Sequence, residues 1–226
     1  MKFLYSIAPT FLLFLLCFTP LLTVAQTKKV KAKGPSRYIQ IESSVLKSDP
    51  SIKDGPSRTL MSGRVVEKGN FENNKKVGVW TYLDSSPNQY LEFDHTLNKV
   101  IDDTRKKSAE QLRKITNAPA DSTVSLEPVF LGSWGIVYRQ LTDKFRVTAE
   151  AVRASVDGTI VVAIKIGDDG KPAAYEVVEK MGYGMDEELL RVLIPILEDS
   201  EWHLPELDTQ QEPNKTFLFP FKIRMR

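Results

Sequence analysis

Residues 158–181, GTIVVAIKIGDDGKPAAYEVVEKM, decide the fold of this chain. Apolar side chains between Thr159 and Ile166 occupy both faces of an alternating pattern. One face of this strand is therefore expected in a core, and the other face is expected to be only partly exposed to solvent. Asp168-Asp169-Gly170 is a turn signal that returns the chain into a second strand at Lys171–Met181. The stretch predicts two paired antiparallel strands.

Three helices are expected around this hairpin. Trp134–Lys144 has helical spacing behind Ser133 as N-cap, and Thr148–Ala154 fits a short second helix. The run Asp186–Glu188 places negative charge at the start of a third helix, where cap and dipole favour it. Pro195 cannot donate within a helix, so we expect the third helix to end or kink there.

A final strand is expected at Thr216–Met225, after Trp202. Alternate residues of this strand should point inward, namely Phe217, Phe219, Phe221, Ile223 and Met225. Pro220 removes a backbone donor and indicates an edge strand. These elements predict an α+β module, a small antiparallel sheet packed with two to three helices. An exposed sheet edge is suited to gripping an extended peptide.

The segment 37–101 has the pattern of short strands and turns. Asn73-Asn74 occupies a hairpin position that needs positive φ, and Trp80 and Tyr82 lie in phase on one strand face. We expect these two aromatics to be core. The segment resembles MORN-type repeats of the YwqK-like variant. The matching residues are Gly63, Gly69-Asn70-Phe71, Asn73, Lys75-Lys76, Gly78, Trp80 and Tyr82. The strand pair near Tyr90–Phe93 resembles a degraded second copy, and the resemblance implies a small β-hairpin docking module.

Residues 126–226 resemble the C-terminal domain of the TonB energy transducer. The likeness rests on Arg146–Ala151 followed by Gly158–Val161, on Asp169–Lys171, on Gly184–Arg191, on Trp202 with Pro205, and on Phe219–Arg224. It implies a two-helix, three-stranded module whose edge pairs with the N-terminal peptide of an outer-membrane receptor. The implied partner-binding residues are Val147, Thr148, Phe217, Phe219, Phe221, Lys222, Ile223 and Arg224.

The chain also departs from the TonB pattern. The family's Tyr-Pro pair is Val147-Thr148 here, and the long Pro/Lys/Glu-rich arm is replaced by the MORN-like segment and a short linker. The resemblance therefore supports the predicted fold more strongly than it supports a role in energy coupling. Lysine and arginine near the last strand would discourage self-pairing and attract an acidic peptide.

The front of the chain predicts the compartment. Residues 3–22 are nearly all apolar, and Thr23-Val24-Ala25 offers small residues where a signal peptide is cleaved. The alternative is an uncleaved anchor, because the run reaches the length of a membrane span. Either way we expect the rest to lie in the periplasm or cell envelope, with inner-membrane motor proteins as further partners if the anchor stays.

Composition excludes several function classes. Cys17, the chain's one cysteine, lies in the apolar run, so a chain cleaved after Ala25 has no thiol chemistry or disulfide. Its net charge falls from +2 to +1 without Lys2, which argues against nucleic acid. His95 and His203 are expected on the solvated surface, no metal-ligand spacing is present, and no cofactor or enzyme activity is predicted.

The predicted organisation is a signal peptide at 1–25, a flexible tether at 26–36, the MORN-like module at 37–101, a linker at 102–125 and the TonB-like module at 126–226. The sequence favours a non-enzymatic envelope protein that binds an extended partner peptide and that serves energy-coupled transport in the fullest form of the hypothesis. The alternative is a soluble periplasmic scaffold that performs no energy transduction.

Overall fold

The computed structural model describes residues 26–84, 86, 88, 90–105, 127–204 and 215–224. The predicted signal peptide, most of the predicted linker, Pro205 and Met225 lie outside these residues. Within the described ranges, no helix combines the length and apolar character needed to cross a bilayer.

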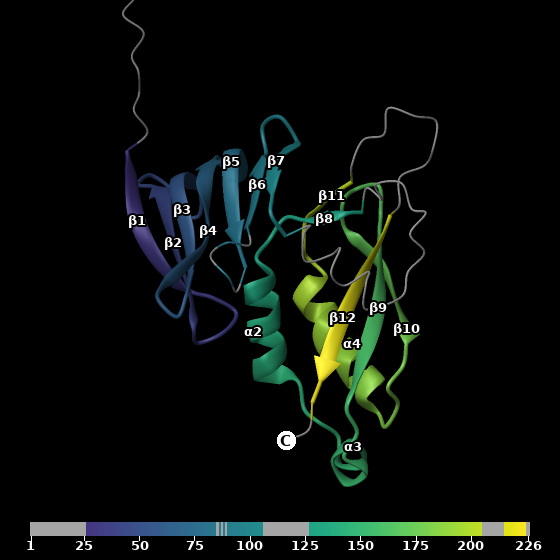
Figure 1. Cartoon of the computed structure of the whole chain (residues 1–226). Helices are drawn as coiled ribbons and strands as arrows, with labels where there is room; N and C mark the ends of the chain where they lie inside the picture. The colour runs from purple at the N-terminus through teal and green to yellow at the C-terminus, as the bar shows by residue number, and fades with distance from the viewer. Residues whose placement is uncertain are drawn as a thin grey trace, which may run out of the picture.

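The N-terminal module is one antiparallel sheet of seven strands in chain order (Figure 1). Its strands are β1 (Thr27–Lys33), β2 (Ile39–Leu46), β3 (Lys53–Met61), β4 (Arg64–Glu72), β5 (Lys75–Leu83), β6 (Tyr90–Asp94) and β7 (Lys99–Asp103). Short turns suffice because each strand pairs with the next along the chain. The sheet is larger than the predicted hairpin module, which was placed at 37–101.

Two boundary predictions were wrong. The segment 26–36 was expected to be a flexible tether, but Thr27–Lys33 forms β1. This strand pairs with β2, from Thr27 opposite Leu46 to Lys33 opposite Gln40. The basic pattern hid this strand because an edge strand buries little and tolerates lysine on both faces. Asp102 and Asp103, assigned to the linker, instead end β7 and pair with Glu92 and Leu91.

The predicted β4–β5 turn is confirmed. Asn73 and Asn74 have φ of 49° and 67°, and Glu72 stands opposite Lys75. Two consecutive positive φ values give the turn that matches the right-handed twist of paired strands. The turn places Trp80 and Tyr82 on the inner face of the sheet, where both are buried as expected.

The C-terminal module confirms the α+β class and the antiparallel sheet. It contains β8 (Val129–Phe130), α2 (Trp134–Lys144), α3 (Ala149–Ala154), β9 (Gly158–Ile166), β10 (Pro172–Glu179), α4 (Met185–Leu197), β11 (Trp202–His203) and β12 (Thr216–Ile223). The main sheet has the order β10-β9-β12. Helices α2 and α4 pack on one of its faces, over Ile160, Val162 and Ile164 of β9 (Figure 1).

The helix ends agree only partly with the predictions. Thr148 caps α3 by accepting from the amide of Ala151. Asp186 accepts from the amides of Met181 and Gly182 and so ties the incoming loop to α4. Pro195 does not end α4, which continues to Leu197. A proline in the last turn forfeits a single ladder bond, so two further residues stay helical.

The two modules meet at β8. The side chains of Val129 and Leu131 pack against Trp80, Tyr82 and Phe93 of the N-terminal sheet. Phe130, between them, belongs to the core under α2 and α4. Because side chains alternate along a strand, this short segment contributes to two cores at once. Figure 1 shows α2 standing between the two sheets.

Polar contacts fix α2 to the N-terminal sheet. Ser133 holds the predicted N-cap position, but its hydroxyl donates to the carbonyl of Leu83 instead of capping the helix. The amides at the helix start bond to carboxylates from the other module, Ser133 to Glu67 and Trp134 to Asp84. The N-terminal sheet therefore supplies the cap of α2.

Candidate functional site

The first candidate site is the outer edge of β12. This strand pairs with β9 from Thr216↔Lys165 to Ile223↔Gly158. No strand of the described residues pairs with its other side, since β12 ends the sheet order. The predicted edge position of the strand is thus confirmed for the part of the chain that the structure describes.

The register shows which backbone groups face outward. The amide of Ile166 donates to the carbonyl of Lys215 at 2.7 Å, and the register places these two residues opposite each other. Bonded pairs alternate along an antiparallel ladder, so Phe217, Phe219, Phe221 and Ile223 direct their backbone groups to β9. The outward groups belong to Thr216, Leu218, Pro220 and Lys222. The missing N–H of Pro220 costs no bond to β9.

The predicted partner-binding residues divide into three groups. Phe219 and Ile223 are buried, and Phe217 and Phe221 pack against the same core. Rings from α2 and the loop after it hold three of these aromatics: Trp134 stacks on Phe217 at 5.2 Å, Tyr138 on Phe219 at 5.6 Å, and Phe145 meets Phe221 at 5.0 Å. These side chains face the helices, away from solvent.

Lys222 and Arg224 are exposed. Val147 is exposed beside Thr148, whose hydroxyl donates to the carbonyl of Tyr183 at 2.6 Å. The contact of Phe145 with Phe221 brings this loop to the carboxyl half of β12. Sequence reasoning missed Leu218, which is 55% exposed between Phe217 and Phe219, two residues that pack into the core. Its alternation against Phe217 and Phe219 was the available signal.

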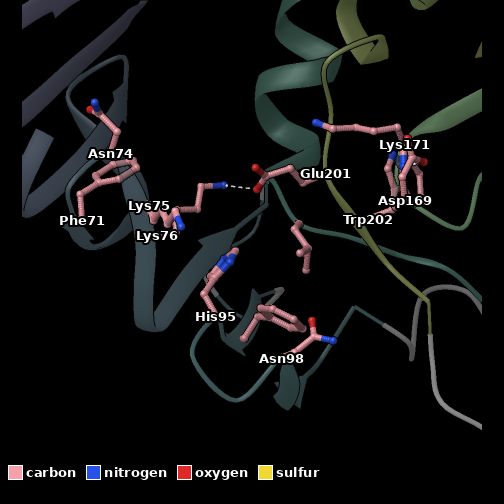
Figure 2. A pocket seen from close by; sticks show the side chains of 13 residues that line it. Phe71, Asn74, Lys75, Lys76, His95, Asn98, Asp169, Lys171, Glu201 and Trp202 are labelled. Carbon is pink, nitrogen blue, oxygen red and sulfur yellow. Dashed lines mark hydrogen bonds and ion pairs between the residues drawn. The ribbon is translucent and has the colours of Figure 1, made fainter. Parts of the chain in front are cut away.

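The second candidate site is a cleft of about 440 Å³ between the modules (Figure 2). Three hairpin turns meet there: the β4–β5 turn at Asn74, the β6–β7 turn at Asn98 and the β9–β10 turn at Asp169-Gly170. The full lining is Phe71, Asn74, Lys75, Lys76, Phe93, His95, Asn98, Leu131, Asp169, Gly170, Lys171, Glu201 and Trp202. No sequence pattern indicated this cleft, because its walls come from segments about a hundred residues apart.

A polar chain crosses the cleft at Lys76. Its ammonium pairs with Glu201 at 2.9 Å (Figure 2). It also donates to the hydroxyl of Tyr82 at 3.3 Å. The ammonium also lies 5.2 Å from the ring centre of Trp80 and 5.4 Å from that of Tyr82. The Tyr82 hydroxyl lies 2.8 Å from His95 Nε2. One cation is thus held by a carboxylate and by aromatic faces.

Burial shifts the pKa values of the side chains that this polar chain links. Burial lowers the pKa of His95 to about 4, and the charge of Lys76 acts in the same direction. Burial raises the pKa of Tyr82, and nearby Glu67 and Glu201 raise it further. For Glu201, burial raises the pKa, but the charge and hydrogen bond of Lys76, together with the charge of Lys171, outweigh burial and leave the pKa below its ordinary value. At neutral pH Glu201 is therefore a carboxylate, Tyr82 a phenol and His95 a neutral imidazole.

The expectation that both histidines lie on the solvated surface was wrong. His95 and His203 are half-buried, and the rings of both lie against the ring of Phe93, with centroid distances of 4.9 and 5.0 Å. The strand pattern around Asp94-His95-Thr96 carried no sign of this, because the C-terminal module supplies part of the cover. Among the described residues, no cluster of three His, Cys, Asp or Glu side chains could hold a metal ion.

Comparison with known proteins adds no family assignment: no protein-family model matches the chain, and neither the curated proteins nor the solved structures contain a match.

Proposed function

We propose that the chain is a peptide-binding protein of the cell envelope that adds an extended partner segment to the outer edge of β12. The observation that carries this proposal is that no strand of the described residues pairs with the outer side of β12, where the backbone groups of Leu218 and Lys222 are directed outward. Such an edge supplies donors and acceptors at the spacing that a guest strand needs.

The energetics suit reversible binding. Each new backbone hydrogen bond contributes about 0.5–1.5 kcal/mol net. Pro220 interrupts the donor row, so a guest strand cannot form an unbroken ladder on this edge. Lys222 and Arg224 are exposed beside it and favour an acidic segment over a second copy of the same basic edge.

The fullest form of the proposal is a TonB-like role, in which the guest is the N-terminal segment of an outer-membrane receptor. The sheet order β10-β9-β12 and the helices α2 and α4 on one face support it, because the resemblance implies a two-helix, three-stranded module with an edge for the receptor. Energy coupling requires that residues 1–25 stay attached as an anchor and meet a motor in the inner membrane.

The alternative is a periplasmic scaffold without energy transduction. The joint at β8 favours it, because Val129, Phe130 and Leu131 tie the two modules into shared cores instead of leaving a free arm between them. Mass determination of the protein taken from membranes separates the two forms. A start at Gln26 supports the scaffold, and a retained residue 1–25 segment supports the transducer.

Leu218→Pro tests the edge. It removes an outward amide while leaving the ladder to β9 intact, so the fold should persist. The matched control Leu218→Ala removes the exposed side chain but keeps the amide. The probes are fluorescein-labelled peptides copied from N-terminal segments of outer-membrane receptors of the same cell.

We expect Leu218→Pro to weaken peptide binding at least tenfold and Leu218→Ala to change it less than threefold, measured by fluorescence polarisation. Thermal unfolding checks that both variants are folded. Equal affinities of the wild type and a folded Leu218→Pro variant would exclude β12 as the binding edge. Turnover of a substrate by the purified protein would contradict the non-enzymatic part of the proposal.

A further inference from the structure

The cleft at the module joint is a site separate from the β12 edge, and its walls are fixed. The amide of Trp202 donates to the carbonyl of Gly170 at 2.9 Å. A Cβ on Gly170 would lie 2.5 Å from the carbonyl oxygen of Trp202, so the β9–β10 turn sits tightly against the segment entering β11. The amide of Leu131 bonds to the carbonyl of Glu201 at 2.8 Å. The cleft is therefore largely preformed.

A hydrogen-bonded chain starts at Lys76 on one side of the cleft. The ammonium of Lys76 has three N–H groups and no acceptor, so the Tyr82 oxygen accepts from it. The Tyr82 hydroxyl also shares a hydrogen bond of 2.8 Å with Nε2 of His95, in which the imidazole tautomer decides which atom donates. Lys76, Tyr82 and His95 thus form a hydrogen-bonded chain that starts at the lysine ammonium.

The charges of the lining favour an anion. Lys75, Lys76 and Lys171 line the cleft together with Asp169 and Glu201, and the Lys171 ammonium donates to the carbonyl of Asp199 at 3.0 Å. The carboxylate of Glu201 already forms an ion pair with the ammonium of Lys76, and the Glu201 side chain is 49% exposed. It can turn into solvent while its backbone carbonyl keeps the bond to Leu131. Three lysines then remain against one lining carboxylate.

The apolar part of the lining indicates a flat body attached to the anion. Phe71 offers a half-buried ring, and the largely buried side chains of Phe93, Leu131 and Trp202 form the apolar floor of the cleft. A volume of about 440 Å³ is within the range of sites for small organic molecules.

We propose that the cleft binds a small organic anion with a flat apolar body, whose anionic group replaces the Glu201 carboxylate at Lys76. In the free protein Glu201 is a built-in competitor for this position. The proposal is independent of peptide binding at β12, because the cleft lining shares no residue with that edge.

The test uses the purified protein and the fluorescence of 8-anilinonaphthalene-1-sulfonate, an aromatic anion. We expect one site per chain. Glu201→Gln removes the competitor and should tighten binding at least threefold. Lys76→Gln should weaken it at least tenfold, and Lys47→Gln, an exposed lysine outside the lining, should leave it unchanged. Lys171→Gln serves as a second cleft variant if Lys76→Gln does not fold.

The opposite sign expected for Glu201→Gln separates a ligand site from a structural ion pair, since loss of a merely structural pair would not improve binding. Unchanged or weaker dye binding in Glu201→Gln overturns the proposal, as does equal binding in Lys76→Gln and the wild type. Competition by benzoate or phenyl phosphate, but not by inorganic phosphate at the same concentration, supports the apolar body. Equal displacement by inorganic phosphate overturns that part.

Discussion

The indole of Trp80 lies against the α-carbon of Gly69 on the neighbouring strand. A Cβ built on Gly69 would stand 2.2 Å from Cδ2 of the indole and 2.3 Å from Cε2. The indole nitrogen donates to the carbonyl of Asn70 at 3.0 Å, and the ring of Phe71 meets the indole edge-on at 5.0 Å. The Gly-Asn-Phe run and Trp80 thus form one packing unit, in which glycine leaves room for the ring.

Gly69→Ala should strongly destabilise the N-terminal sheet. The added methyl must displace the buried indole, and overpacking of this kind costs about 1–3 kcal/mol. Denaturant unfolding followed by tryptophan fluorescence measures the change. Gly158→Ala is the matched control, because its Cβ would meet Met181 at an ordinary 3.4 Å. A loss no larger in Gly69→Ala than in this control would show that the ring can shift without cost.

Much of the C-terminal module could be predicted because its elements carry local signals. The alternation in Thr159–Ile166, the glycine turn after it and the acidic start of α4 each fix a local conformation. Pro220 marked an edge strand because proline removes a donor wherever it lies. In the N-terminal module, Asn73-Asn74 also carried a local signal, because few residue pairs adopt the positive φ that this hairpin turn needs.

The rest depends on contacts between distant segments. Thr27–Lys33 is a strand because β2 offers it a pairing edge, although its own composition resembles a solvated tail. Ser133 had the residue type of an N-cap, but Asp84 of the other module took the capping bond. The cleft around Lys76 needs Glu201 from the far end of the chain. Such pairings leave no periodic trace in a single sequence.

Asp84 and His95 should give opposing pH dependences. Burial raises the pKa of Asp84 from 3.8 to about 6, against the attraction of Arg105 and the amide of Trp134. The folded protein then binds this proton more tightly than the unfolded chain, so Asp84 lowers the free energy of unfolding as pH rises from about 4 to about 6. Neutral His95 acts oppositely: its stabilisation is complete above 6.5 and is lost as pH falls towards 4.

Asp84→Asn keeps an acceptor for the Trp134 amide and removes the titration. Relative to the wild type, its free energy of unfolding should increase between pH 4 and 6 by on the order of 2 kcal/mol, because each pKa unit corresponds to about 1.36 kcal/mol. His95→Gln should show the reverse difference between pH 6.5 and 4. Urea unfolding at half-unit pH steps measures both. Parallel curves for the wild type and Asp84→Asn would contradict the raised pKa.

Tyr175→Phe should stabilise the protein. The Tyr175 hydroxyl is buried and has no hydrogen-bond partner in the described part of the chain, and burial raises its pKa to about 12. A buried unsatisfied hydroxyl costs about 1–3 kcal/mol, which phenylalanine of the same shape avoids. The midpoint of urea unfolding should rise at constant slope. Tyr138→Phe, which alters a tyrosine on α2, controls for a general effect of hydroxyl removal, and a lower midpoint for Tyr175→Phe would reveal a partner for the hydroxyl.

Arg105→Met should uncouple the two modules. Arg105 pairs with Asp103 at 3.2 Å and donates to the carbonyls of Phe130 and Gly132 at 3.1 Å each, so it spans from β7 to the segment that enters α2. Both charged side chains are nearly buried. Removing one partner of such a pair costs about 3–5 kcal/mol, because the other charge stays behind without compensation.

The double variant Asp103→Asn/Arg105→Met leaves no orphaned carboxylate and should recover part of that loss. Amide hydrogen exchange of the single variant Arg105→Met identifies the region affected. Protection should fall at Val129–Gly132 and in β6 and β7, and it should stay high in β9, whose core lies under α4. Equal loss of protection across β9 would mean that Arg105 stabilises the whole molecule instead of the joint. An unchanged exchange pattern would mean that the apolar contacts of Val129 and Leu131 hold the modules together without it.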